Sequence, residues 1–241
     1  NIPVVDYTWF FDSEYVENKD KILKDIKKVN YPVVVKPATL GSSIGITFVK
    51  DEKSIEEAIE EAIKYDVKVI VEKAVENLVE VNASVLGNYN YQTVSPIEEV
   101  VREDEILSYK DKYLGNSKKT QSKGMVSTTR IIPARISDEM SKNIVSTSKE
   151  VFKVLNLSGV CRIDYLIDKN TDKYYVNEPN TIPGSLSFYL WKEAGVSYSE
   201  LLDEMISIAI KNYKNKQKKI KSFDSNILEG FNGSKGSKGT K

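Results

Sequence analysis

Two short stretches, CRIDY at residues 161–165 and VNEPNTIPG at residues 176–184, decide how this chain folds. Side chains alternate between the two faces of a β-strand, so Arg162 and Asp164 point to one face of the first strand. For the same reason Glu178 and Asn180 share one face of the second strand. Because only a short polar turn separates the strands, the sequence predicts a hairpin-like pair that places all four side chains on one face of a sheet.

These four side chains provide two carboxylates, one amide oxygen and one guanidinium, a set that suits a magnesium site. Three oxygen ligands fit Mg²⁺, which usually keeps several waters and also binds substrate phosphates. The guanidinium beside them could stabilise negative charge that develops during a reaction. A solvated sheet face with cross-strand ion pairs would have the same composition, so the hairpin alone leaves both interpretations open.

The composition excludes several kinds of catalytic site. The chain has 241 residues, of which 40% are apolar and 29% charged, enough for one large or two modest domains with a core. It contains no histidine and a single cysteine, Cys161, which excludes histidine-based catalytic sites, histidine-ligated zinc and an internal disulfide. Catalysis would have to use carboxylates, lysines, arginines, amides, hydroxyls and backbone N–H groups. The unpaired thiol fits a reducing compartment, which favours a cytoplasmic location.

The charge is distributed unevenly, although 35 basic and 35 acidic side chains cancel over the whole chain. Residues 211–241 hold nine lysines against two acidic residues, and the pattern predicts a basic, disordered tail over residues 214–241. The remainder is mildly acidic, so no nucleic-acid partner is indicated. No apolar run approaches the roughly 18 residues of a membrane span. Because the chain begins with Asn1 and not with methionine, the sequence predicts a fragment or a processed chain.

Hydrophobic patterns predict two groups of helices and strands. The first group contains a short strand within residues 1–7, a helix over 13–28, strands over 32–36, 46–49 and 67–71, and a helix that begins with a capping box of Ser54 and Glu57. The second group contains strands over 81–86, 91–94, 131–132, 159–167 and 174–177, a helix over 137–155 that buries Met140, Ile144, Val151 and Val154, and a helix from the Ser197–Glu200 capping box to about Tyr213. The polar segment 104–129 is typical of a functional lid or of disorder.

Two further groups of residues are candidates for ligand binding on weaker patterns. Lys36 precedes the small-residue loop Gly41–Gly45, whose backbone N–H groups could cradle a phosphate, although a simple turn would have the same composition. Glu72, Lys73 and Glu80 could bind a base and a ribose, but charges at strand ends are more often solvated.

The order of these motifs along the chain resembles the D-alanine–D-alanine ligases, which belong to the ATP-grasp superfamily. The matching stretches are VVVKPATLGSSIG (33–45), VEK (71–73), EVNASVLGN (80–88), SYKDKYLG (108–115), CRIDY (161–165) and NEPNTIPG (177–184). The resemblance covers residues 1–213 and implies an α+β, ATP-grasp fold in which two α+β subdomains grip ATP between antiparallel sheets. The central subdomain would be residues 1–72 and the C-terminal catalytic subdomain residues 73–213.

The resemblance also implies a role for each matching position. The residues implied to bind ATP are Lys36, Gly41, Ser42, Ser43, Glu72, Lys73, Ala74, Val75, Glu80, Lys112 and Leu166. Those implied to bind two Mg²⁺ or Mn²⁺ ions are Asp164, Glu178 and Asn180. Those implied in catalysis are Ser42, Lys112, Tyr113, Arg162 and Gly184, of which Arg162 and the Gly184 backbone would stabilise a tetrahedral intermediate.

The implied reaction is ADP-forming and joins two D-alanines through an acyl phosphate, as a step in making peptidoglycan precursors. Tyr113 matches a tyrosine that the family associates with an amino acceptor, so D-alanine or D-serine is favoured over D-lactate. Two alternatives are an ATP-grasp ligase for another amino acid and an ATP-binding fragment that is inactive without its N-terminal domain.

Three departures from the family pattern stand out. Nothing in the chain corresponds to the family's N-terminal domain, so that domain of the same protein is an expected partner, as is a second copy in a homodimer. Tyr189 stands where the family usually has a serine that binds the acceptor carboxylate, so Ser185 or Ser187 would have to replace it. Pro179 lies between two implied metal ligands, where it removes one strand donor and leaves both ligand side chains in place.

Overall fold

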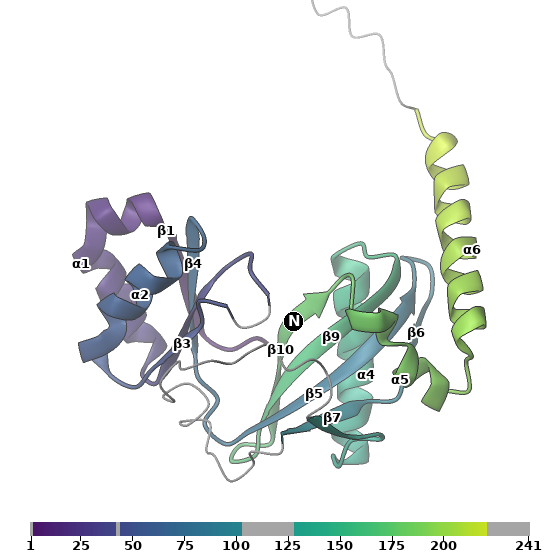
Figure 1. The fold of residues 1–241 in the computed structure, drawn as a ribbon, viewed down its shortest axis with the longest axis horizontal. Coiled ribbons are helices and arrows are strands. Elements are labelled where there is room, and N and C mark those ends of the chain that lie inside the picture. Colours follow the sequence, from purple (N-terminus) through teal and green to yellow (C-terminus); the bar gives the residue numbers. More distant parts are fainter. Residues whose placement is uncertain (1, 42–43, 103–127, 221–241) are drawn as a thin grey trace, which may run out of the picture.

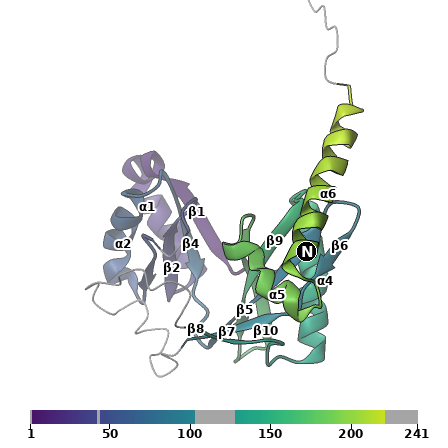
Figure 2. The same ribbon diagram turned by 45° about the vertical axis from the view of Figure 1, so that its right-hand side comes forward.

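The computed structural model describes residues 2–41, 44–102 and 128–220, which form two antiparallel β-sheets, each backed by helices. Figure 1 shows the two lobes side by side, with the smaller lobe built from the first part of the chain. Figure 2 shows the same separation after a turn of 45°. Each lobe therefore has its own sheet and its own core, and the space between them is the natural place for a ligand.

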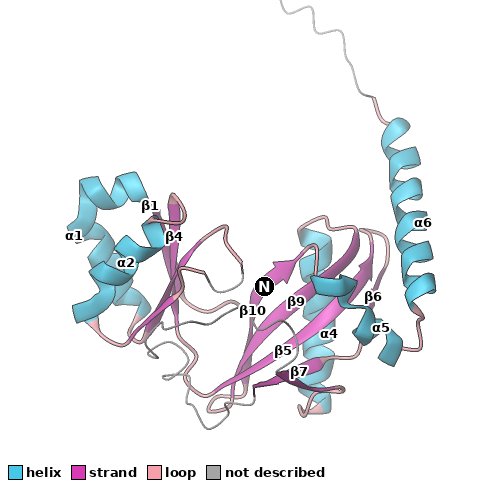
Figure 3. Ribbon diagram, viewed as in Figure 1, coloured by secondary structure: helices cyan, strands magenta, loops and turns pink. Residues whose placement is uncertain are grey.

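The smaller lobe is a four-stranded sheet covered on one face by two helices (Figure 3). Its strands follow the order β1 (Tyr7–Phe11), β4 (Lys68–Lys73), β2 (Val33–Pro37) and β3 (Thr47–Val49), and its helices are α1 (Asp12–Val29) and α2 (Ile55–Ile63). Val33 and Val35 pack into the core beneath the helices, whereas Val34 packs with Phe48 on the opposite face. The prediction that the valine run is buried on both faces is confirmed.

Two local predictions in the smaller lobe are wrong. Ser54 makes no side-chain cap, because α2 is entered through a 3₁₀ turn whose first N–H groups are satisfied by Asp51, which accepts from the Lys53 amide. The first strand begins only at Tyr7. The residues before it connect the two lobes, since Pro3 accepts a hydrogen bond from the Val176 amide of the other sheet.

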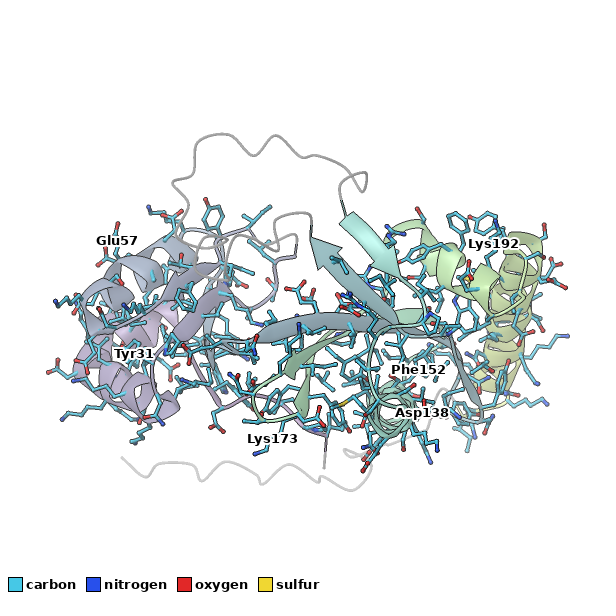
Figure 4. The ribbon with its side chains drawn as sticks, turned by 90° about the horizontal axis from the view of Figure 1, so that it is seen from below. Tyr31, Glu57, Asp138, Phe152, Lys173 and Lys192 are labelled. Atoms are coloured by element: carbon cyan, nitrogen blue, oxygen red, sulfur yellow. The ribbon has the colours of Figure 1, made fainter. Side chains whose placement is uncertain are left out.

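The larger lobe is a six-stranded sheet in the order β10-β9-β5-β7-β8, with β6 paired to β5. The strands are β5 (Leu78–Gly87), β6 (Gln92–Val94), β7 (Glu98–Arg102), β8 (Thr128–Ile131), β9 (Gly159–Asp168) and β10 (Lys173–Asn180). Helix α4 (Asp138–Val154) covers one face and builds the main core there, and Figure 4 shows Phe152 where this helix meets the sheet. The opposite face is left for the cleft and for the C-terminal helices.

Helix α4 follows the predicted periodicity with one exception. Met140, Ile144 and Val151 are buried as expected, but Val154 is 65% exposed and Phe152 is buried in its place.

The C-terminal helices pack on the other face of the larger sheet. They are α5 (Phe188–Glu193) and α6 (Tyr198–Gln217), and α6 extends away from the body in Figures 1 and 2. Trp191 is fixed by a 3.0 Å hydrogen bond from its indole Nε1 to Ser84 Oγ. The capping box of Ser197 and Glu200 is confirmed. The helix runs four residues past Tyr213, so the start of the expected tail is helical, with Lys214 and Lys216 near the negative end of the helix dipole.

The subdomain boundary suggested between residues 72 and 73 falls one residue before the end of β4 and stays a prediction. Residues 221–241 of the expected tail lie outside the described residues, as does nearly all of the polar segment 104–129. Among the helices that the structure describes, none is long and apolar enough to cross a membrane.

Glu99 on β7 ties the connection between β8 and α4 to the sheet. Its carboxylate accepts from the Arg135 amide at 3.0 Å, Nε at 3.1 Å and Nη2 at 2.6 Å. The hydrogen bonds from Arg135 keep the pKa of Glu99 below its ordinary value. A carboxylate whose folded-state pKa is depressed stabilises the fold above its ordinary pKa and loses this effect as the pH falls through the depressed value.

We therefore expect Glu99→Gln to lower the free energy of unfolding by about 1–2 kcal/mol at neutral pH, since Arg135 is partly solvated. The difference from the unmodified protein should shrink as the pH falls through the depressed pKa of Glu99, where its carboxyl becomes protonated. Urea unfolding of both proteins at neutral pH and at acidic pH measures this difference in the free energy of unfolding. Replacement of the exposed Glu57 by glutamine is the control. An equal loss at both pH values would contradict the ionic role of Glu99.

Candidate functional site

A cleft of about 680 Å³ lies between the two sheets. Most of the residues predicted to bind a ligand line it: Lys36, Gly41, Glu72, Lys73, Val75, Glu80, Arg162, Asp164, Leu166, Glu178 and Asn180. They come from β2, β4, β5, β9, β10 and the loops beside them, so the fold brings together residues that are far apart in the sequence.

A row of polar side chains crosses the floor of the cleft. The register pairs Glu178 of β10 with Asp164 of β9, Asp164 with Asn82 of β5, and Asn82 with Glu98 of β7. Directly paired residues of antiparallel strands project to the same face of a sheet. The row therefore presents four polar side chains to the same cleft, and we call it the polar row.

The hairpin reaches this arrangement through a β-bulge. The ladder shifts between Val176, which pairs with Tyr165, and Glu178, which pairs with Asp164. Without the shift, Glu178 would pair with Ile163 and face the core under α4. Because β10 is the edge strand, the bulge and Pro179 disturb the ladder on one side only.

Arg162 and Asp164 form the closest contact at this end of the cleft. The guanidinium donates from Nε at 2.7 Å and from Nη2 at 2.9 Å, one bond to each carboxylate oxygen. Asn180 Nδ2 adds a third bond to Asp164 at 3.0 Å. The hydrogen bonds to Asp164 raise the pKa of the Arg162 guanidinium. The predicted gathering of these side chains is confirmed, and their immediate arrangement is a hydrogen-bonded ion pair.

Glu178 has a different environment. Burial raises the pKa of its carboxyl, the charge of Asp164 raises it further, and Lys36 and Arg162 oppose the shift. Two carboxylates that repel each other in a partly buried place are stabilised by a divalent cation. In the part of the chain that the structure describes there is no group of three His, Cys, Asp or Glu side chains around a metal position, but two carboxylates and the Asn180 amide fit Mg²⁺, which keeps several waters.

The predicted nucleotide-binding residues come from both sheets, Lys36, Glu72 and Lys73 from the smaller sheet and Glu80 and Leu166 from the larger one. Lys36 Nζ lies 2.6 Å from Glu72 Oε2, and Lys73 Nζ donates to the Tyr31 carbonyl at 2.9 Å. Glu80 and Leu166 are paired in register on β5 and β9, and both line the cleft. An aliphatic side chain, a partly buried ion pair and a carboxylate on a strand in one cleft suit a base, phosphates and a ribose.

Several predicted residues lie elsewhere. Ala74 is 4% exposed and packs in a small cluster with Val34 and Phe48, so it does not line the cleft itself. Gly184 is exposed and is also not among the lining residues. Ser42, Ser43, Lys112 and Tyr113 lie outside the described residues, and their roles stay predictions.

Neither serine proposed to replace the missing acceptor-binding serine reaches the cleft. Ser185 is exposed and Ser187 is fully buried, and neither lines the cleft. Both belong to a turn in which Ser185, Leu186 and Ser187 have φ values of 53°, 53° and 52°. Three successive left-handed residues other than glycine are costly, and such strain is retained mostly where a site requires it. Here the turn leads into α5 and delivers Tyr189 to the cleft.

The structure adds a group of cleft residues that sequence patterns did not reveal as a site: Glu98, Arg130 and Tyr189, which we call the Arg130 cluster. Tyr189 OH donates to Glu98 Oε2 at 2.8 Å, and Arg130 Nε lies 3.3 Å from Glu98 Oε1. The Arg130 guanidinium lies 4.1 Å from the Tyr189 ring centroid. Burial, followed by the hydrogen bond to Glu98, raises the pKa of Tyr189 to about 12. Only Tyr189 could have been noticed in the sequence, as a departure from the family pattern.

The comparisons with known proteins agree with this geometry. A family model described as the D-ala D-ala ligase C-terminus matches residues 1–207. The chain belongs to this ligase C-terminal family. The D-alanine–D-alanine ligase of Thermosipho africanus is 41% identical over 229 residues, which cover 95% of this chain and 59% of the relative. That of Clostridium acetobutylicum is 41% identical over 214 residues, with 87% and 59% covered.

Solved ligase structures have the same fold. The VanG D-Ala:D-Ser ligase from Enterococcus faecalis matches with a TM-score of 0.69 at 30% identity, over 86% of this chain and 57% of that one. The D-alanine–D-alanine ligase from Coxiella burnetii matches with a TM-score of 0.70 at 27% identity, over 90% and 55%. The ligase C-terminal family member described here therefore has the ATP-grasp fold, and it spans somewhat under three fifths of the relatives' length.

The repulsion within the polar row can be tested on Glu178. We expect Asp164→Asn to lower the pKa of Glu178, because the variant removes a neighbouring negative charge and frees Arg162 from its partner. The pKa should stay above its ordinary value, because burial is the larger cause of the shift. Carbon NMR of the Glu178 carboxyl during a pH titration measures this change. Asp168→Asn, in the turn beyond the cleft, is the control, and an unchanged Glu178 pKa in Asp164→Asn would contradict the coupling.

Proposed function

We propose that this chain is the ATP-binding and catalytic part of an ADP-forming ligase that joins two D-amino acids, with D-alanine as the donor. The observation that carries the proposal is the pairing of Glu178 with Asp164 on the floor of a cleft whose other wall presents Lys36. Membership of the ligase C-terminal family supports the same reaction. The product would serve as a peptidoglycan precursor, which would place the protein in the cytoplasm.

At the nucleotide end of the cleft, separate groups of residues bind the base, the ribose and the phosphates of ATP. Val75 and Leu166 contact the base, Glu80 binds the ribose hydroxyls, and Lys36 and Lys73 contact the phosphates. Both lysines have partners that compete for them, Glu72 for Lys36 and the Tyr31 carbonyl for Lys73. Phosphate oxygens replace these partners when the nucleotide binds. Ser42, Ser43 and Lys112, outside the described residues, stay predicted phosphate-binding residues.

At the other end, Asp164, Glu178 and the Asn180 amide oxygen hold one or two Mg²⁺ ions. When bound, the metal neutralises negative charge on the phosphoryl group during transfer. Arg162, released from part of its contact with Asp164, stays beside the same phosphoryl group and the acyl carbon. It stabilises the oxyanion of the tetrahedral intermediate, and the implied contribution of the Gly184 N–H stays a prediction because Gly184 does not line the cleft.

The reaction then proceeds in two steps. A carboxylate oxygen of the first D-alanine attacks the γ-phosphorus, and ADP leaves with the electron pair of the broken P–O bond. The amine of the second amino acid attacks the acyl carbon, inorganic phosphate leaves with the electron pair of the C–O bond, and the amine proton passes to phosphate or solvent. The cleft between two lobes keeps bulk water from the acyl phosphate. The acceptor is D-alanine or D-serine.

Nucleotide binding is testable on this chain alone. We expect a non-hydrolysable ATP analogue with Mg²⁺ to bind in a calorimetric titration, and Lys36→Met to weaken binding about tenfold or more through loss of a charged phosphate contact. Lys36→Arg keeps the charge, and Lys68→Met, outside the cleft, is a matched control. Absence of binding at millimolar nucleotide would overturn the nucleotide site.

Turnover is tested on this chain and on a form that also carries the N-terminal region of the Thermosipho africanus relative. We expect weak activity from the chain alone and D-alanine-dependent phosphate release from the longer form. Glu178→Gln should abolish release and leave the circular dichroism spectrum unchanged, because it removes a metal ligand at the surface of a sheet. The assay compares D-alanine, D-serine, D-lactate and L-amino acids, and stimulation by an L-amino acid only would contradict the proposal.

A further inference from the structure

The Arg130 cluster forms the far end of the polar row from the metal-binding residues. Glu98 is 2% exposed and already accepts a hydrogen bond from Tyr189, so its charge is partly satisfied without Arg130. The ion pair with Arg130 joins Nε to Glu98 Oε1 at 3.3 Å. A guanidinium has five N–H donors in a rigid plane, and those on the terminal nitrogens remain for another anion.

The ion pair between Arg135 and Glu99, the residue that follows Glu98 on β7, is an example of a structural contact. Arg135 contacts Glu99 with its backbone amide, its Nε and its Nη2, all at 3.1 Å or less. Neither residue lines the cleft, whereas Glu98 and Arg130 both do. The Arg130 pair is looser and faces the cavity, as expected for a group that also binds a ligand.

Tyr189 links the Arg130 cluster to the reaction centre. Tyr189, Arg130 and Arg162 all line the same cleft, and the charges of both arginines oppose the larger effect of burial on the pKa of Tyr189. Tyr189 cannot replace a carboxylate-binding serine directly, because its hydroxyl proton is donated to Glu98. It instead holds Arg130, whose guanidinium lies over its ring.

An independent sign of a ligand comes from Asn82, between the two ends of the polar row. Its side chain is 4% exposed and lines the cleft, and its Oδ1 has no hydrogen-bond partner among the described residues. A buried amide oxygen without a partner costs free energy, and such atoms are rare in folded proteins. A ligand that donates a hydrogen bond at this position would satisfy it.

We propose that Arg130 binds the carboxylate of the acceptor amino acid while Asn82 Oδ1 accepts a hydrogen bond from its amino group. Glu98 and Tyr189 are positioning residues that fix the guanidinium. The inference rests on the proposed ligase function and names the residues that recognise its second substrate. An α-amino acid carries the two groups that these residues select, a carboxylate for the guanidinium fork and an amine for the amide oxygen.

The decisive variants remove Arg130 with and without its buried partner. Arg130→Gln alone leaves Glu98 without its counter-ion, so the double variant Glu98→Gln/Arg130→Gln restores neutrality and keeps the fold testable. Both should raise the KM for the acceptor about 10- to 100-fold and leave the KM for ATP unchanged. Arg135→Gln is the matched control and should leave both values unchanged.

A second readout separates recognition from stability. In the form that releases phosphate, D-alanine competes with D-alaninamide, which has the amine but lacks the carboxylate, and mass spectrometry measures the two products. The unmodified protein should strongly prefer D-alanine as acceptor, and both Arg130 variants should lose most of this preference. A merely structural Arg130 would leave the product ratio unchanged.

The inference is overturned if the variants keep the preference for D-alanine, if they raise the KM for ATP instead, or if Arg135→Gln has the same effect. Each of these outcomes leaves the ligase proposal standing, because the unmodified protein would still make the dipeptide. Absence of phosphate release from the unmodified protein with any amino acid would overturn both.

Discussion

The bulge in β10 is the local feature on which the arrangement of the cleft depends. Before it, Val176 pairs with Tyr165 and packs into the core under α4, and after it Glu178 pairs with Asp164 and faces the cleft. A continuous ladder would direct the carboxylate into that apolar core, at a cost of several kcal/mol. A shift of one residue exchanges the two faces of a strand. The bulge therefore lets Val176 pack in the core and Glu178 face the cleft, although the two residues are only two positions apart.

Ion pairs between basic and acidic side chains order the cleft in the absence of a ligand. Lys36 pairs with Glu72, Arg162 with Asp164, and Arg130 with Glu98, so each of these three cations has an acidic partner. Removing either partner of such a pair would leave a partly buried charge without its counter-ion, which is costly. A ligand of the right charge exchanges one partner for another, and this exchange costs less than ordering free side chains.

Local patterns predicted those parts of the molecule in which one element determines the outcome. The buried valine run of β2, helix α4 and the Ser197 capping box each follow from residues within one segment. Alternation placed Arg162 with Asp164, but the bulge that turns Glu178 toward them depends on pairing with another strand. The Arg130 cluster could not be predicted, because Glu98, Arg130 and Tyr189 lie on three elements that only the tertiary fold brings together. Ser54 failed as a cap for a local reason, since Asp51 caps a 3₁₀ turn that leads into α2.

The spacing of strands explains why the acceptor would lie over β5 and β7. Neighbouring strands are about 4.8 Å apart, so the polar row from Glu178 to Glu98 spans about 14 Å in three steps. Glu178 and Asp164 occupy the first step, and in the proposed reaction the metal that they would hold lies beside the acyl phosphate. The last step runs from Asn82 to Glu98, which is paired with Arg130. It places the amide oxygen that would bind the amino group one strand spacing from the guanidinium that would bind the carboxylate. That separation suits two groups on one carbon atom once hydrogen bonds are added at each end. In the proposed reaction the amine would face β9, where Arg162 lies beside the acyl carbon.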